Sequence, residues 1–195
     1  MDFEVAIMRA YTVTLSRILF AASLWCLAGL ANAGQFYIGA QATNLTAYLD
    51  YGNGSETYNL NPTRIELGWK EPTFYWAIHM LTSGQDTDVD LYGSTYEMKL
   101  DPSYGIFLGL NSPNFYISFG FQNFDTTYRD ISTTLRDKSN ILTLAVQLGI
   151  HHELVPHLYL YADFSAYTGK ADYSGFTSNP DFTVHGLAGG IKFTF

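Results

Sequence analysis

The residues of this chain that could do chemistry are few, and the most regularly spaced are acidic. Asp86, Asp88 and Asp90 alternate with uncharged residues, and Glu97 follows them. These carboxylates have the 1, 3, 5, 12 spacing at which a calcium-binding loop presents its oxygen ligands. However, Leu91 stands where such a loop requires glycine, and no helical pattern flanks the segment. We therefore predict a solvated acidic loop, keep Asp86, Asp88 and Asp90 as a weak metal candidate, and predict no cofactor.

Histidine is the other residue type to weigh, because a nucleophilic serine needs an imidazole base and an orienting partner. His185 falls on the same side of its segment as the apolar Leu187. The side chains expected beside it are all apolar: Phe164 and Ala166, or Ala40 and Ala42 if the first and last strands meet. No serine or acid is placed next to His185, so we predict no catalytic residue.

The composition of the chain limits the elements that could position these groups. The sequence has 195 residues, with 10 Lys+Arg and 18 Asp+Glu, which give a net charge of −8. This length predicts a single domain, and the acidic balance excludes nucleic acid as a partner because phosphate binding requires a basic patch. Only 14% of the residues are charged while 47% are hydrophobic, which argues against disorder.

The first 33 residues have the pattern of a cleaved secretory signal peptide. Two arginines precede an apolar run at 18–31, and Ala31-Asn32-Ala33 supplies the small residues of a cleavage site. The run is too short for a spanning helix, which needs about 20 apolar residues. We predict cleavage after Ala33 and a single β-barrel domain over 34–195. The start codon, Met1 or Met8, is left open.

A repeat of about forty residues organises the rest of the chain. Gly68, Gly109, Gly149 and Gly189 lie 41, 40 and 40 residues apart. Each of the first three is followed by a short turn and a second segment of apolar residues. The residues alternate between apolar and polar or small with period two, most clearly over 140–151, which indicates half-buried strands.

This pattern predicts eight antiparallel strands joined alternately by short turns and long loops. We place the strands at 36–45, 63–70, 73–82, 95–110, 115–124, 140–151, 157–168 and 182–195. The short turns are 71–72, 111–114 and 152–156, and the long polar loops are 46–62, 83–94, 125–139 and 169–181.

Two folds fit this pattern, a soluble sandwich and a membrane barrel. A sandwich has no reason to separate short turns from long loops, whereas an outer-membrane barrel does. Aromatic residues beside the short turns are those expected of an interfacial girdle: Phe36, Tyr37, Trp69, Phe74, Tyr75, Trp76, Phe115, Tyr116 and Tyr159. We therefore predict an all-β fold, an eight-stranded antiparallel up-and-down transmembrane β-barrel.

The polar faces of the predicted strands carry balanced charges, as a closed interior requires. We predict that these charges point into the lumen: Arg64, Lys70, Lys99 and Lys192 against Glu66, Glu97, Asp101 and Asp163. Eight strands leave an interior just wide enough for side chains to fill it. The excess acids lie in the loops, where they would repel anionic lipopolysaccharide unless divalent cations bridge the two.

The mature chain resembles the small outer-membrane β-barrel family, the OmpA/OmpX-like class of Gram-negative bacteria. The resemblance rests on the signal peptide, the repeat and the last strand, where Gly190, Phe193 and Phe195 match the family's glycine and aromatic positions. Ala188 departs from the polar residue that is usual there.

The resemblance implies an outer-membrane location and a terminal strand that is read by the barrel-assembly machinery. It also implies outer-membrane lipid and lipopolysaccharide as partners of a monomer. The favoured function is a non-enzymatic barrel that supports envelope integrity or surface interaction through four extracellular loops. Two alternatives stay open, an enzyme that modifies lipid A or phospholipid and a small pore.

Overall fold

Strands account for most of the described residues between Gln35 and Phe195. The computed structural model describes residues 34–50, 54–84, 87–91, 94–130, 136–172 and 179–195. Among these residues, no helix is long and apolar enough to cross a membrane. The strands are β1 (Gln35–Asp50), β2 (Ser55–Leu60), β3 (Thr63–Lys70), β4 (Phe74–Leu81), β5 (Thr87–Leu91), β6 (Ser94–Leu100), β7 (Ser103–Asn111), β8 (Phe115–Asp130), β9 (Arg136–Val155), β10 (Leu158–Lys170) and β11 (Asp181–Thr194).

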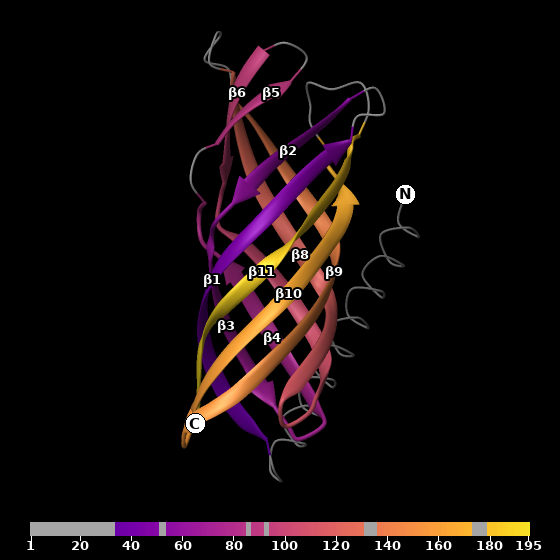
Figure 1. Ribbon diagram of the computed structural model, residues 1–195. Coiled ribbons are helices and arrows are strands. Elements are labelled where there is room, and N and C mark those ends of the chain that lie inside the picture. Colours follow the sequence, from indigo (N-terminus) through magenta and orange to yellow (C-terminus); the bar gives the residue numbers. More distant parts are fainter. Residues whose placement is uncertain (1–33, 51–53, 85–86, 92–93, 131–135, 173–178) are drawn as a thin grey trace, which may run out of the picture. The chain divides into compact units, whose positions relative to one another are not determined.

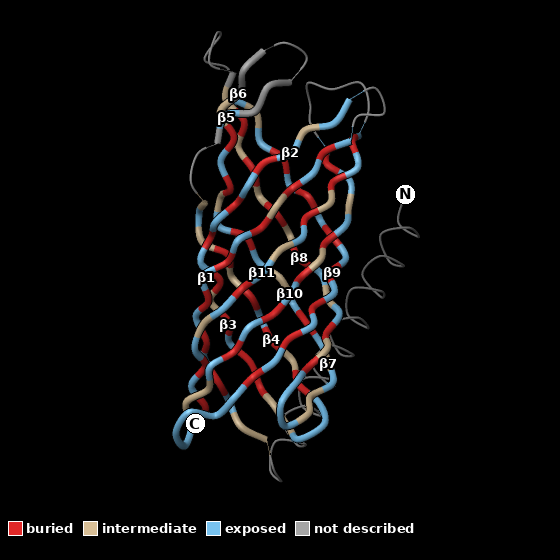
Figure 2. Tube along the Cα trace, in the orientation of Figure 1, coloured by how far each residue is buried: buried red, intermediate tan, exposed pale blue. Residues whose placement is uncertain are grey.

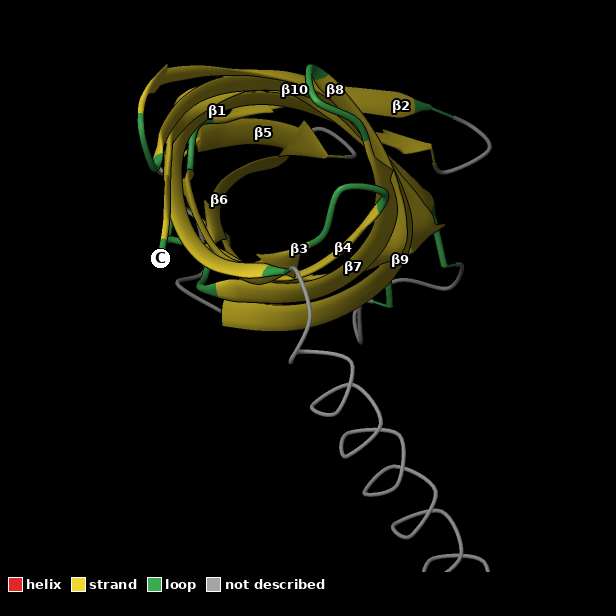
Figure 3. Ribbon diagram, turned by 90° about the horizontal axis from the view of Figure 1, so that it is seen from below, coloured by secondary structure: helices red, strands yellow, loops and turns green. Residues whose placement is uncertain are grey.

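Eight of these strands form a closed ring (Figures 1 and 3). Around the ring they follow the order β1, β3, β4, β7, β8, β9, β10 and β11, and β11 pairs back with β1 from Thr194 to Asp181. All of these pairings are antiparallel. The predicted fold class, an eight-stranded antiparallel barrel, is therefore confirmed.

The remaining strands extend the barrel at the end away from the short turns (Figure 1). There β2 pairs with β1, β6 pairs with β8, and β5 pairs with the other side of β6. Backbone hydrogen bonds along β1 and β8 are thus satisfied well past the ends predicted for these strands.

Partway along each long strand, away from the short turns, the residues that face the lumen change from polar to apolar. The residues that face outward change from apolar to polar. Inside β1, the polar Gln41 gives way to Leu45, while outside the exposed Ile38 gives way to Asn44. The same exchange occurs in β9, where the outward residues before Leu142, such as Asn140 and Lys138, are polar and those after it are apolar. Figure 2 shows the underlying alternation of buried and exposed residues along the strands.

This exchange divides the barrel into two zones. Near the short turns the outer surface is an apolar belt around a polar interior, which is the arrangement of a barrel in lipid. Beyond the belt the outer surface is polar and the interior is apolar, which is the arrangement of a protein in water. The strands therefore project past the belt as a second zone with its own hydrophobic core.

Several predicted strand ends are wrong for this reason. The sequence pattern places loops at 46–62, 125–139 and 169–181, where the outward face becomes polar. In the structure β1 continues to Asp50, β8 to Asp130, and β9 begins at Arg136, because inward apolar residues still hold the ladder together. At the other end, β9 continues to Val155 and the predicted turn at 152–156 shrinks to two residues.

The predicted strand 95–110 is also wrong, because it contains a β-bulge. Leu100 pairs with Thr126 and Gly105 with Gln122, so four residues of one strand face three of β8. Pro102 has no N–H to donate at this point. The Ser103 hydroxyl accepts the Asp125 backbone N–H at 3.0 Å and thereby completes the ladder. A one-residue insertion sends every following side chain to the opposite face.

Candidate functional site

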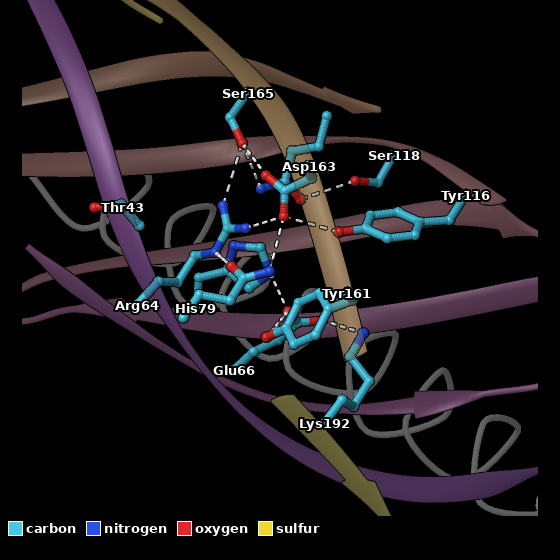
Figure 4. A network of polar contacts seen from close by, with 12 residues as sticks. Thr43, Arg64, Glu66, His79, Tyr116, Ser118, Tyr161, Asp163, Ser165 and Lys192 are labelled. Atoms are coloured by element: carbon cyan, nitrogen blue, oxygen red, sulfur yellow. Dashed lines mark hydrogen bonds and ion pairs between the residues drawn. The ribbon is translucent and has the colours of Figure 1, made fainter. Parts of the chain in front are cut away.

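Inside the apolar belt, the lumen contains a buried network of charged and polar side chains (Figure 4). Arg64 on β3 forms a salt bridge with Asp163 on β10, and both side chains are almost completely buried. Arg64 Nε also donates to Gln41 on β1, and Arg64 Nη1 donates to the Ser165 hydroxyl at 3.2 Å. All of these side chains point inward, because they occupy the lumen-facing positions of the period-two alternation on β1, β3 and β10.

A second acid, Glu66 on β3, organises the part of the network nearer the short turns. Lys192 Nζ on β11 lies 3.2 Å from Glu66 Oε1, and the Tyr37 hydroxyl donates to the same oxygen at 2.5 Å. The Tyr161 hydroxyl donates to Glu66 Oε2 at 3.4 Å. His79 Nε2 lies 3.7 Å from that oxygen, too far for a strong hydrogen bond.

Tyrosine rings surround the ammonium group of Lys192. Its Nζ lies 4.1 Å from the ring centroid of Tyr37 and 4.6 Å from that of Tyr161, distances that suit cation–π attraction. The Tyr116 ring is within 5.4 Å, and its hydroxyl donates to Asp163 at 2.9 Å. These tyrosines therefore join the Lys192–Glu66 pair to the Arg64–Asp163 pair.

The network balances its charge, with two acids and two bases at its centre. Taking a carboxylate or an ammonium out of water costs several kcal/mol unless a partner of opposite charge is held in good geometry. Here each ion has such a partner and further polar neighbours, which offset the cost of taking the four charges out of water. Ions passing through the lumen would have to displace these pairs.

An apolar cluster closes the lumen beyond the polar network. Phe124 packs edge-on against Tyr167 and Phe182, with ring centroids 5.1 and 5.5 Å apart. The other members come from all around the ring: Leu45, Ala47, Leu49, Tyr58, Leu60, Leu81, Met98, Leu100, Phe107, Tyr128, Ile141, Ala145, Ala171 and Val184. A polar path through the barrel is thus interrupted by packed hydrocarbon.

The structure brings only part of the predicted lumen charges together. Arg64, Glu66, Asp163 and Lys192 meet in the network. By contrast, the predicted lumen positions of Glu97, Lys99 and Asp101 are wrong, because Lys99 is exposed and the other two are partly exposed. The bulge at Asp101-Pro102 reverses the faces of β6 relative to β7, so Met98 and Leu100 point inward instead.

Sequence reasoning missed most of the neutral members of the network. Tyr37, Tyr75 and Tyr116 belong to the predicted girdle, but they are buried inside the barrel. Position in the strand was the available signal, since Tyr37 shares its face with Gln41 and not with Phe36. The exposed girdle retains Phe36, which packs against Trp69 at 4.7 Å and against Phe195 at 6.4 Å.

The weak metal candidate falls on a strand. Asp86 lies outside the described residues, while Asp88 and Asp90 belong to β5, where Asp88 pairs with Glu97 and Asp90 with Thr95. An extended hairpin of this kind does not wrap its carboxylates around an ion as a calcium loop does. Within the described ranges, no three His, Cys, Asp or Glu side chains are placed to hold a metal.

His185 and the terminal strand both lie at the seam where the ring closes. His185 is exposed, and its cross-strand partners are Thr46 and Ala166. At the end of β11, Phe193 and Phe195 stack with ring centroids 6.4 Å apart on the outer surface. Gly190 faces inward, and a Cβ there would come within 2.0 Å of the Ala40 carbonyl oxygen, so glycine allows close approach of β1.

The apolar belt, the closed ring and the charged interior together define a transmembrane β-barrel. No protein-family model matches the chain, and no curated protein matches it. Its structure is similar to that of Neisserial surface protein A, with a TM-score of 0.57 and 14% identity over 82% of this chain and 97% of that one. It is also similar to the outer membrane protein AlkL, with a TM-score of 0.55 and 13% identity over 84% and 91% of the two chains.

At these identities the likeness shows the fold. The chain has the fold of the small bacterial outer-membrane β-barrels, and the predicted location in the outer membrane agrees with that fold.

Proposed function

We propose that this protein is a non-enzymatic, non-conducting outer-membrane barrel that presents a folded surface beyond the membrane. The observation that carries this proposal is the exchange of polarity along the strands. A barrel that served only as an anchor would need no second hydrophobic core above the belt. Here the second zone gives the strands beyond the belt a fixed shape, which suits contact with other molecules or a role in envelope integrity.

Planar-bilayer recordings test the non-conducting part of the proposal. Purified protein is expected to show no stable conductance step, because both the ion pairs and the apolar cluster block the lumen. A reproducible open state would contradict this interpretation. A 16- to 18-stranded porin, whose lumen is an aqueous channel, serves as the positive control for insertion.

The outward face of the second zone supports contact with anionic lipopolysaccharide. Four basic residues lie on adjacent strands β6, β8 and β9: Lys99, Arg129, Arg136 and Lys138. Arg129 pairs with Glu97 at 3.4 Å, and Arg136 stands directly opposite Arg129. Since like charges opposite each other are unfavourable, a bound polyanion would stabilise this face.

Binding to lipopolysaccharide-containing vesicles tests this contact. The double variant Lys99→Glu/Lys138→Glu is expected to bind several-fold more weakly than the wild type, with the difference shrinking at high salt. Lys170→Glu, on β10, is the control and is expected to bind as the wild type does. Equal binding by all three proteins would refute the assignment.

An enzymatic role is the second candidate, and His185 is the residue on which it depends. The lipid profile of cells that express the protein is expected to match that of cells that lack it. A lipid change that disappears with His185→Ala would overturn the non-enzymatic proposal.

The assembly role of the terminal strand also stays a proposal. Its support is that Phe193 and Phe195 lie exposed on the outer face of the closing strand. Removing Phe195 is expected to lower the folded amount in the membrane while leaving in vitro refolding nearly unchanged. Equal loss in both settings would indicate a purely structural contribution.

A further inference from the structure

The mouth of the barrel at the short-turn end is hollow. A cavity of about 380 Å³ lies between the β3–β4 turn, the β7–β8 turn and the β9–β10 hairpin. Its lining includes Lys70, Asn111, Ser112, Asn114, His151 and Tyr159. These residues come from three separate connections, so the closed ring, and not any one segment, builds the cavity.

Lys70 provides the positive charge of this cavity. Its Nζ lies 3.6 Å from the centroid of the Tyr159 ring, and the side chain is only partly exposed. In the part of the chain that the structure describes, no salt bridge joins Lys70 to an acid. The next base inward, Lys192, is already paired with Glu66. Lys70 is therefore a cation aimed at the cavity without a fixed counter-ion.

Two side chains beside Lys70 are held in fixed positions, and one amide at the rim can donate to a ligand. His151 Nε2 lies 2.8 Å from the Ser112 carbonyl oxygen, so that nitrogen carries a proton and the ring is held in place. Asn111 is fixed in the same way, because its Nδ2 donates to the Glu71 carbonyl at 2.9 Å. Asn114 lies exposed at the rim, with an amide that can donate to a ligand.

One acid, Glu153, also lines the cavity and attracts the Lys70 ammonium without forming a salt bridge with it. Glu153 Oε1 accepts the backbone N–H of His157 at 3.2 Å within the β9–β10 hairpin. A metal is not favoured here, since the described residues contain no group of three His, Cys, Asp or Glu with suitable placement. The Lys70 ammonium, which Glu153 attracts but does not pair with in a salt bridge, and the rim amides are the groups of the cavity that can bind an anion.

We propose that this cavity, defined by Lys70, Asn111, Asn114 and His151, binds an oxyanion that enters from the short-turn end. A carboxylate or a phosphate satisfies Lys70 and accepts from the rim amides, while the Tyr159 ring holds the lysine in position. Two sources present this chemistry at that end of the barrel, a soluble anion and the headgroup of an anionic phospholipid. The site is independent of the surface contact proposed above.

The test is a titration of the full chain in a neutral maltoside detergent, free of phosphate, at constant ionic strength. Inorganic phosphate and acetate are added while the ring signals of His151 and His185 are followed by NMR. We expect a saturable shift of the His151 signal, whereas His185, on β11 at the far end of the belt, does not move. Lack of a saturable shift with both anions refutes the proposal.

Variants separate the site from general charge effects. Lys70→Gln is expected to weaken phosphate binding by about tenfold, because a charge-assisted hydrogen bond is lost, while Lys70→Arg retains most of it. Lys170→Gln is the matched control, because Lys170 forms an exposed salt bridge with Asp181 on another part of the surface. This variant is expected to bind phosphate as the wild type does. Equal binding by Lys70→Gln and the wild type refutes the assignment.

Two further arms complete the experiment. Asn114→Asp places a negative charge at the exposed rim without touching the lumen, and it is expected to weaken binding even if Lys70→Gln folds poorly; unchanged binding contradicts the proposal. Nanodiscs with phosphatidylglycerol or with phosphatidylcholine distinguish the sources. A His151 shift with the anionic lipid assigns the site to a headgroup, and a shift with free phosphate alone assigns it to a soluble anion.

Discussion

Breaking the Arg64–Asp163 pair should destabilise the barrel strongly. Asp163 accepts hydrogen bonds from Gln41 at 2.9 Å, Tyr116 at 2.9 Å and Ser165 at 2.8 Å, besides its salt bridge with Arg64. In Arg64→Met these neutral donors remain, but the carboxylate loses its salt-bridge partner. An uncompensated buried charge lowers the free energy of unfolding by about 3–5 kcal/mol.

The assay is urea unfolding of the barrel in lipid vesicles, followed by the change in gel mobility between folded and boiled protein. The double variant Arg64→Met/Asp163→Leu removes both charges, so it should recover much of the loss, and the coupling energy should be large for residues in direct contact. Recovery occurs because no ion is left buried without a partner.

The exposed pair Lys170–Asp181 is the matched control. Its Nζ–Oδ1 distance is 3.6 Å and both side chains are more than two-thirds exposed. Lys170→Met should cost no more than about 1 kcal/mol, because water screens the pair. The reasoning fails if Arg64→Met costs as little as Lys170→Met, or if the double variant is no more stable than Arg64→Met.

Two pairs of substitutions test the packing of the lumen and the bulge by the same unfolding assay. A Cβ on Gly149 would lie 2.3 Å from the Tyr116 ring, so Gly149→Ala should cost about 1–3 kcal/mol. Gly189→Ala should cost little, because its Cβ would meet only the Tyr161 carbonyl oxygen, at 4.0 Å. Met98→Lys should cost about 3 kcal/mol or more because it buries a charge in the apolar cluster, while Lys99→Met should change stability by no more than about 0.5 kcal/mol. If Lys99→Met destabilised the barrel more than Met98→Lys does, the bulge would not reverse the faces of β6.

Local pattern was sufficient to predict the barrel but not the length of its strands. Where outward residues are apolar, as at Leu144 and Leu148, strict alternation marks a strand. Before Leu142 in the chain, outward residues such as Asn140 and Lys138 are polar, and the pattern there predicts a loop. Inward residues such as Leu49 of β1 and Tyr128 of β8 keep their apolar character past the predicted strand ends, and this was the signal for continued strands.

Part of the lumen network was predictable for a similar reason. The period of two places Arg64 and Glu66 on one face of β3, and the same rule places Asp163 and Lys192 inward. Partner choice was not predictable, because Arg64 and Asp163 lie 99 residues apart and meet only when the ring closes. Register between distant strands decides which opposite charges meet.

By itself the sequence determined the alternation, the number of strands in the ring and the transmembrane class, because each depends on residues close in the chain. Only the tertiary structure decided which charges lie in the lumen, where the barrel leaves the apolar belt, and which residues build the mouth cavity around Lys70. A single extra residue at Asp101-Pro102 reversed one predicted face; Pro102 marks an irregular position, but only the pairing with β8 shows that one extra residue is inserted there. Such features arise from the pairing of whole strands, which closes the ring and fixes every inward side chain at once.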